Sequence, residues 1–351
     1  MRLLVAGGAG FIGSAFTRRR LQATADEVVV VDKLTYAGSL ENLIGLDSDP
    51  SARDRFGFVK GDIADHQLMH ELVGQSDAVV NFAAESHVDR SILDATAFLR
   101  TGVLGVHALL EAVREVTDRR RSSAGSAVRF VQVSTDEVYG PVESGVSYED
   151  DQLHPRSPYS AAKAAGELLV RSYRETYGLD LLITRGANTY GPRQHVEKFI
   201  PLFITNAIRD MPLPIYGDGQ QRRDWLFVDD HADGIGAVLD EGESGEIYNI
   251  GADEERVNRQ VAEAILNALG KSHSLITTVA DRRGHDRRYA MDTNRIARLG
   301  WSARMDFETG IAATVEWYRQ NETWWRRLRD ADWDAYYERQ YGWRLAESAK
   351  N

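Results

Sequence analysis

Arg2-Leu-Leu-Val-Ala-Gly-Gly-Ala-Gly-Phe-Ile-Gly13 joins a short apolar run to a turn with glycines at positions 7, 10 and 13. The apolar run predicts a buried strand, and the residues after the turn have the pattern of a helix. A bare backbone there lets a pyrophosphate approach the helix N-terminus, where N–H groups and the positive end of the dipole favour an anion. Taken alone, the same pattern could be a tight strand-to-helix turn without a ligand.

A second predicted strand, Val28-Val-Val-Val-Asp32, favours the ligand-binding interpretation. It ends in a carboxylate at the place where dinucleotide-binding folds hold a ribose hydroxyl. A carboxylate there repels a 2′-phosphate and so favours NAD over NADP, with Lys33 as the opposing signal.

Short apolar runs alternate with helix-length segments through the first half of the chain. They are Leu3–Ala6, Val28–Val31, Phe56–Val59, Ala78–Phe82, Phe130–Ser134 and Leu181–Thr184. Nearly continuous hydrophobic strands separated by helices predict an α/β fold with a doubly wound, Rossmann-like parallel sheet. Such a sheet binds its ligands at the carboxyl ends of the strands.

The alternation weakens after about residue 186, where turn-forming residues become frequent. We expect an NAD-binding Rossmann domain over 1–185, to which segments around 225–250 return. A smaller mixed α/β lobe for the substrate is expected over 186–330, followed by a C-terminal tail over 331–351. Arg119–Ala127, rich in Arg, Ser and Gly, is expected to be an exposed loop before a strand.

The composition excludes several functions. A net charge of −11 with only short basic runs disfavours a nucleic-acid surface, because phosphate binding needs clustered cations. The absence of cysteine excludes disulfides and thiolate chemistry. The chain starts with a strand rather than a signal peptide, and its apolar runs fall short of the roughly 20 residues that span a bilayer. We therefore expect a cytoplasmic protein that does not enter a membrane.

Two further motifs carry proton-transfer groups. Ser134-Thr-Asp-Glu-Val-Tyr-Gly140 places two adjacent carboxylates after a hydroxyl at the end of a predicted strand. Tyr159 and Lys163 are spaced i, i+4 on a helix that Ser157 and Pro158 begin, so they lie on one face. A neighbouring ammonium and an oxidised nicotinamide both favour the tyrosine phenolate. The alternatives are a capped turn with solvent-facing acids and an ordinary amphipathic helix.

With these motifs the chain resembles the dTDP-glucose 4,6-dehydratase family of the extended short-chain dehydrogenase/reductase superfamily. The resemblance runs from residue 1 to about residue 325. Besides the motifs above, it rests on Val31–Gly38, Phe82–Ser91, Ser157–Ser160, Tyr216–Gln220, Arg223–Trp225, Tyr248–Gly251 and Gly284–Tyr289.

The resemblance implies a reaction without net redox change. Tightly bound NAD would oxidise carbon 4 of dTDP-glucose, water would leave across carbons 5 and 6, and the hydride would return to carbon 6. In this family Asp136 is the acid for the departing hydroxyl, Glu137 is the base for the carbon 5 proton, and Thr135 hydrogen-bonds the hydroxyl on carbon 4. Two adjacent carboxylates disfavour each other's charge, so one protonated acid beside one ionised base is electrostatically natural.

The resemblance also implies the ligand-binding residues, and no metal site. Besides the catalytic Thr135, Asp136, Glu137, Tyr159 and Lys163, NAD would contact Gly7, Gly10, Phe11, Ile12, Gly13, Asp32, Lys33, Leu34, Thr35, Asp62, Ile63, Phe82, Ala83, Ala84, Glu85, Ser86, Thr101 and Thr189. The nucleotide sugar would contact Ser86, Asn188, Lys198, Phe199, Pro214, Tyr216, Arg223, Asn258, Arg282 and His285. Thr189 and Arg193 depart from the family's asparagine and aromatic residue. An arginine beside the sugar pocket could alter substrate preference.

Assembly and alternative functions follow from the same resemblance. Thr101–Thr117 and the helix with Tyr159 resemble the pair that forms a four-helix interface in this superfamily, which implies a homodimer. An NAD-dependent nucleotide-sugar epimerase or decarboxylase would leave Asp136 and Glu137 without a role. A non-catalytic NAD-binding protein would need neither Tyr159 nor Lys163.

Overall fold

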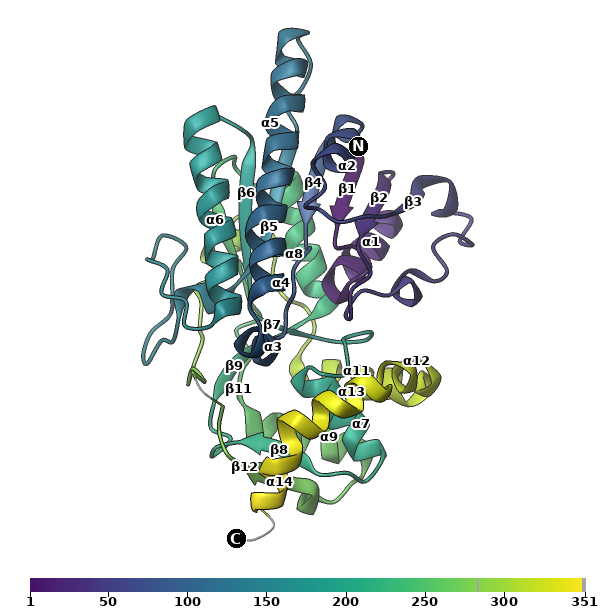
Figure 1. The fold of residues 1–351 in the computed structure, drawn as a ribbon, viewed down its shortest axis with the longest axis vertical. Coiled ribbons are helices and arrows are strands. Elements are labelled where there is room, and N and C mark those ends of the chain that lie inside the picture. The colour runs from purple at the N-terminus through teal and green to yellow at the C-terminus, as the bar shows by residue number, and fades with distance from the viewer. Residues whose placement is uncertain (283, 349–351) are drawn as a thin grey trace.

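A seven-stranded parallel sheet forms the centre of the computed structural model, which describes residues 1–282 and 284–348 (Figure 1). The strand order is β10-β6-β5-β4-β1-β2-β3, so the predicted doubly wound fold is confirmed. The predicted strands differ from the observed ones by one or two residues at their ends. The strands are β1 (Arg2–Ala6), β2 (Glu27–Asp32), β3 (Phe56–Lys60), β4 (Ala78–Asn81), β5 (Arg129–Thr135), β6 (Leu181–Gly186) and β10 (Ile247–Ile250).

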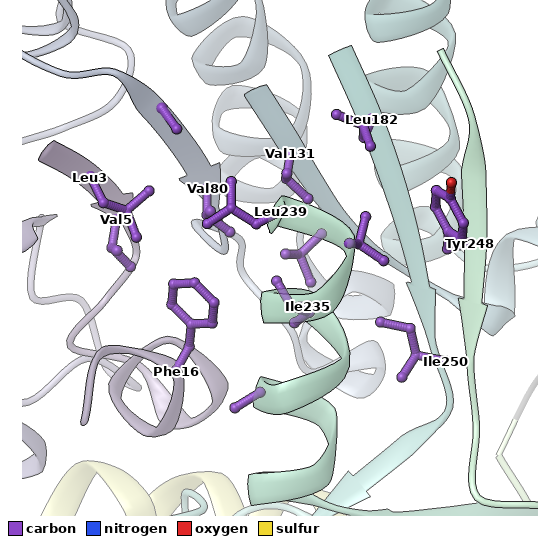
Figure 2. Close-up of a cluster of buried hydrophobic side chains, with 14 of the residues drawn as sticks. Leu3, Val5, Phe16, Val80, Val131, Leu182, Ile235, Leu239, Tyr248 and Ile250 are labelled. Carbon is purple, nitrogen blue, oxygen red and sulfur yellow. The ribbon is translucent and has the colours of Figure 1, made fainter. Parts of the chain in front are cut away.

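Helices cover both faces of the sheet because successive strand residues point to opposite sides. One face is covered by α1 (Phe11–Ala23) and α8 (Val228–Glu241). Figure 2 shows this core, with Leu3 and Val5 of β1 facing the same layer as Phe16 of α1 and Ile235 of α8. The other face is covered by α2 (His66–Gly74), α5 (Val106–Ser122) and α6 (Pro158–Tyr177).

A long continuous helix crosses the second face. It comprises α4 (Thr96–Leu99), a π-helical turn (Arg100–Gly105) and α5. By length and composition, Thr96–Ser122 is the one helix in the described chain that could cross a membrane, which the sequence analysis did not anticipate. Half of its most apolar window is buried inside the protein, as in a core helix. The predicted loop at Arg119–Ala127 is wrong in its first part, because α5 continues to Ser122.

A second lobe has its own hydrophobic core, which includes Trp325 and Tyr318. It holds a three-stranded sheet of β7 (Asn188–Tyr190), β9 (Arg222–Phe227) and β11 (Glu255–Val257), and a pair of β8 (Leu213–Tyr216) with β12 (Ile276–Val279). Its helices are α7 (Phe199–Ile208), α9 (Asn258–Leu269), α11 (Phe307–Gln320), α12 (Glu322–Leu328), α13 (Ala331–Tyr337) and α14 (Trp343–Ser348). The short helices α3 (Val88–Leu93) and α10 (Asn294–Ala297) lie outside this core, and α10 packs on β10.

Candidate active site

One pocket lies at the carboxyl ends of the central strands, where the strand order reverses between β1 and β4. The turns after β1, β2, β4, β5 and β6 all contribute to its lining. It brings together the predicted catalytic residues and nearly all of those predicted to hold the cofactor. Leu34 is the one predicted cofactor residue that is not part of the described pocket lining. Its N–H instead donates to the Asp32 carboxylate at 2.8 Å.

The glycine turn shapes the pocket floor. Gly7 has a φ of +75°, and a Cβ there would lie 2.5 Å from the backbone nitrogen of Ala83, so no larger residue fits. A Cβ at Gly13 would lie 2.4 Å from the Gly7 carbonyl oxygen. Helix α1 begins directly after Gly10, and the residues of its first turn line the pocket. Backbone N–H groups and a bare turn at a helix N-terminus fit the pyrophosphate of a dinucleotide.

Asp32 is anchored at the end of β2. Its two carboxylate oxygens accept hydrogen bonds from the Ala9 N–H at 3.0 Å and the Leu34 N–H at 2.8 Å. Burial raises the pKa of Asp32, while these two backbone donors oppose the shift. The carboxylate is thereby held in a fixed direction on the pocket wall, where its remaining lone pairs can accept ribose hydroxyls.

Asp136 and Glu137 follow β5 in a single 3-10 turn, yet they meet different charges. Burial, together with the Glu137 charge, raises the pKa of Asp136 to about 7. Burial also raises the pKa of Glu137, but the cations Arg282, Arg223 and Lys198 oppose the shift. Arg223 also opposes the shift at Asp136, where the Glu137 charge adds to burial. Of the two, Asp136 is therefore the better candidate for a protonated acid and Glu137 for an ionised base. The Thr135 hydroxyl donates to Asp136 Oδ1 at 3.1 Å and fixes the orientation of the acid.

Tyr159 and Lys163 reach the same pocket from the first turns of α6. The predicted cap is present, since the Ser157 side chain accepts from the Ser160 N–H at 3.0 Å. The Lys163 ammonium donates to the Val133 carbonyl of β5 at 2.6 Å, and burial lowers its pKa to about 8. Burial, followed by the Glu137 charge, raises the pKa of Tyr159, whereas a hydrogen bond with Thr135 lowers it. A positively charged ligand in the pocket would therefore be needed to stabilise the phenolate.

Thr189 contacts a histidine that sequence reasoning missed. The Thr189 hydroxyl lies 3.0 Å from the Ala187 carbonyl oxygen, to which it can donate, and 2.7 Å from His231 Nδ1. Burial lowers the pKa of His231 to about 4 and keeps it neutral. Its Nε2 is a buried ring nitrogen without a partner among the described residues, on a ring that lines the pocket. Such a nitrogen fits the carboxamide of a nicotinamide, whose NH₂ group donates and whose oxygen accepts.

The remaining substrate candidates divide between the two lobes. Ser86, Asn188 and Lys198 line the pocket beside the catalytic groups. The others lie in the second lobe, outside the described pocket lining: Phe199, Pro214, Tyr216, Arg223, Asn258, Arg282 and His285. Some of these form one cluster, in which the rings of Tyr216 and His285 meet edge to face at 5.8 Å. The charges of Arg223 and Arg282 oppose the raised pKa of Glu137, so both guanidinium groups lie near that acid.

Asp89 joins this cluster although no function was predicted for it. Its carboxylate accepts from the Tyr216 hydroxyl at 3.1 Å and from Arg282 Nη1 at 3.2 Å. Its place inside the matched stretch Phe82–Ser91 was the only signal in the sequence. No quoted motif contained His231.

Arg193 does not lie where the sequence analysis suggested. Within residues 1–282 and 284–348, its neighbours Gln194 and His195 line the pocket and Arg193 does not. Its backbone has a φ of +69°, and its guanidinium lies 5.5 Å from the ring centre of Trp317 in the second lobe. The structure therefore gives Arg193 no contact through which it could select the sugar.

Known proteins share this fold and most of the chain. Residues 4–314 match the model of the family described as GDP-mannose 4,6 dehydratase. The low-salt glycan biosynthesis protein Agl12 of Haloferax volcanii is 50% identical, over 91% of this chain and 98% of its own. A dTDP-glucose 4,6-dehydratase of Streptomyces niveus is 47% identical, over 95% and 97%. The crystal structure of the dTDP-glucose 4,6-dehydratase DesIV from Streptomyces venezuelae, with NAD and a TDP ligand bound, has a TM-score of 0.88 at 48% identity and covers 93% of this chain and 100% of that one.

Proposed function

The chain belongs to the dTDP-glucose 4,6-dehydratase family, and we propose that it converts dTDP-glucose to dTDP-4-keto-6-deoxy-glucose with NAD as its cofactor. One observation carries the proposal. The pocket with the dinucleotide turn also holds two adjacent buried carboxylates, one whose pKa is raised further by its neighbour's charge and one beside three cations. An epimerase or decarboxylase of the same fold would give this pair no function, and a protein that only binds NAD would need no acid or base.

NAD fits the residues of the first lobe. The glycine turn and the start of α1 would hold its pyrophosphate, Asp32 its ribose, and His231 Nε2 its carboxamide. When bound, NAD supplies the hydride acceptor for carbon 4 and the hydride donor for carbon 6. Because the reaction returns it to its starting state, we expect the protein to retain it between turnovers.

Tyr159 would remove the proton from the hydroxyl on carbon 4. The phenolate that this requires is disfavoured by burial and by the Glu137 charge, so it forms only when the positive charges of the bound cofactor and Lys163 offset them. Thr135 would hold the reacting hydroxyl of the sugar in line with the phenol of Tyr159. Its own hydroxyl lies at the end of β5, within hydrogen-bonding reach of that phenol.

Asp136 and Glu137 would carry out the elimination. Once carbon 4 is a ketone, the carbanion at carbon 5 is stabilised as an enolate, and Glu137 takes the carbon 5 proton. The bond between carbon 6 and its oxygen breaks as Asp136 donates a proton to that oxygen, which leaves as water. After this step Glu137 is protonated and Asp136 ionised, the reverse of their starting states.

The cations of the second lobe would hold the nucleotide. Lys198, Arg223 and Arg282 all oppose the raised pKa of Glu137, so all three cations lie near that acid. Three convergent cations suit the pyrophosphate of a nucleoside diphosphate sugar. The ring of Tyr216 in the same cluster would offer a face to the pyrimidine.

The test is incubation of the purified protein with dTDP-glucose in deuterated water, without added cofactor. We expect a product that has lost one water and carries one deuterium, at carbon 5. The Glu137→Gln variant should lose both the product and the deuterium. An unchanged substrate mass from wild-type protein with intact NAD would contradict the dehydratase assignment and favour an epimerase acting on another nucleotide sugar.

We further propose a homodimer that works in the cytoplasm, with residues 1–185 and the returning segments around 225–250 serving NAD, the rest of 186–330 mainly serving the nucleotide sugar, and 331–351 as a tail. Exposed leucine and isoleucine side chains gather on α3, on the helix from Thr96 to Ser122 and on α6, namely Ile92, Leu93, Leu99, Leu104 and Leu168. An apolar patch of this kind is typical of a protein interface. Helices from each of two copies would cover it.

A further inference from the structure

The C-terminal segment, residues 331–348, lies beyond the family match, which ends at residue 314. It consists of α13, a π-helical turn (Glu338–Gly342) and α14, and it runs along the second lobe (Figure 1, yellow). π-helical turns are rare and are often found at functional sites. Gln340 and Tyr341, both buried, lie in this turn.

Gln340 closes a ring of three hydrogen bonds with residues of both lobes. Its amide Nε2 donates to Asp89 Oδ2 at 2.9 Å and to the Tyr216 hydroxyl at 2.7 Å. The Tyr216 hydroxyl donates in turn to Asp89 Oδ2 at 3.1 Å. The amide uses both of its protons and the phenol its only one, so each donor direction in the ring is fixed.

This ring of hydrogen bonds positions Tyr216 and Arg282, the two side chains that the proposed function assigns to the nucleotide. Asp89 also pairs with Arg282 Nη1 at 3.2 Å, so the carboxylate holds Arg282 and Tyr216 at once. Asp89 is only 6% exposed, and hydrogen bonds to a buried charge are strong. Loss of the Gln340 donor would leave this carboxylate with fewer partners and free the phenol to turn.

Two aromatic side chains of the C-terminal segment add further contacts to the same two lobes. The ring of Tyr341 stacks on Tyr216 with centroids 5.8 Å apart and planes inclined by 27°. The ring of Tyr336 covers the guanidinium of Arg90, the neighbour of Asp89 on α3, at 4.6 Å. Arg90 itself pairs with the buried Glu197 at 2.7 Å. The C-terminal segment thus contacts α3 of the first lobe and β8 of the second at one point.

We propose that the C-terminal segment completes the nucleotide subsite, and that Gln340 is a positioning residue that acts through Asp89 and Tyr216. Its amide orients the Tyr216 ring for the pyrimidine and the Arg282 guanidinium for the pyrophosphate. This inference rests on the proposed dehydratase function. It predicts that Gln340 affects nucleotide affinity and leaves the chemistry at the sugar and the cofactor site unchanged.

The test compares Gln340→Met, which keeps the size and removes the donor, with Gln340→Glu, which sets a second carboxylate against Asp89. We measure KM and kcat with dTDP-glucose, the Kd of dTDP by calorimetry, and the NAD content after gel filtration. For Gln340→Met we expect KM and the dTDP Kd to rise about tenfold, as for one lost hydrogen bond to a charged group, with kcat changed less than about twofold. Gln340→Glu should raise both further, and NAD content should match the wild type.

Gln320→Met is the matched control, because that glutamine donates to Glu316 on the exposed face of α11, away from the nucleotide. It should behave as the wild type in every assay. A wild-type KM and dTDP Kd in both Gln340 variants would overturn the inference. So would a parallel loss of kcat, NAD content and thermal stability, which indicates a purely structural contact. Wild-type protein that neither turns over dTDP-glucose nor binds dTDP would refute the proposed function itself.

Discussion

Asp136 and Glu137 are neighbours in the chain, but we propose opposite tasks for them. Three cations of the second lobe oppose the raised pKa of Glu137, whereas at Asp136 the Glu137 charge adds to burial and Arg223 opposes it. The pattern of two acids after a strand was visible in the sequence. Their difference was not, because Arg223 and Arg282 come from distant segments that only the fold brings to Glu137.

The raised pKa of Asp136 predicts a pH dependence of turnover. As the acid, Asp136 must be protonated, and with a pKa of about 7 this form predominates below that pH and is lost above it. We therefore expect kcat to fall as the pH rises through about 7. Asp136→Asn should lower kcat roughly a hundredfold or more and remove this limb, because an amide does not titrate there. If kcat of the variant still fell as the pH rises through about 7, the fall would belong to the titration of a group other than Asp136.

His231 and Gln340 could not be predicted from the sequence, whereas other residues of the site could. The glycine turn, Asp32, Tyr159 and Lys163 could be found because local spacing places them on a turn, a strand end and one helix face. His231 and Gln340 act through contacts with residues far along the chain, such as the bond from Gln340 to Asp89. No local pattern encodes such a contact.

Helix α6 carries Tyr159 and Lys163, for which we propose catalytic roles, and is held against the sheet by a buried ion pair. Glu167 of α6 and Arg185 of β6 meet at 2.7 Å with both side chains essentially inaccessible. Arg185 also donates to the Tyr139 hydroxyl at 2.7 Å and the Glu149 carbonyl at 2.9 Å. The pair therefore fixes α6, β6 and the turn after β5 relative to one another.

Removing one partner of this pair should destabilise the protein strongly. Glu167→Gln leaves the Arg185 charge buried without a counter-charge, which typically costs about 3–5 kcal/mol in the free energy of unfolding. Chemical denaturation measures this loss, and Glu175→Gln on the exposed face of the same helix is the control. Equal stability of the two variants would show that the pair contributes little to holding α6.

At the element level, the sequence predicted strands better than helix ends. Strands of a doubly covered sheet are nearly pure apolar runs, so their positions are visible in the sequence. The end of α5 was taken for a loop because of its Arg and Ser content. In the fold, Arg120 and Arg121 donate to the Ser76 carbonyl at 3.0 Å and the Gly178 carbonyl at 2.8 Å, and these tertiary contacts support the last turn.

The whole molecule leaves an apolar patch that a second copy would cover. Leu104 is 60% exposed and Leu168 is 54% exposed, on packed neighbouring elements of the same face. A charge on this patch should therefore prevent the dimer that we propose. We expect Leu104→Asp and Leu168→Asp to run at half the wild-type mass in light scattering, whereas Ile44→Asp, equally exposed but outside the patch, should not. Wild-type protein at the mass of one chain would contradict the dimer.

The return of β10 to the sheet has a consequence for how the protein is made. β6 pairs with β5 on one side and with β10 on the other, but residues 187–246 separate β6 from β10 and include much of the second lobe. A nascent chain leaving the ribosome therefore keeps one edge of β6 open, with unpaired backbone groups that invite association with other chains. The open edge of β6 is paired only when β10 has been translated, after part of the second lobe. The two lobes must mature together, and a ribosome that stalls between them would release a chain prone to aggregate.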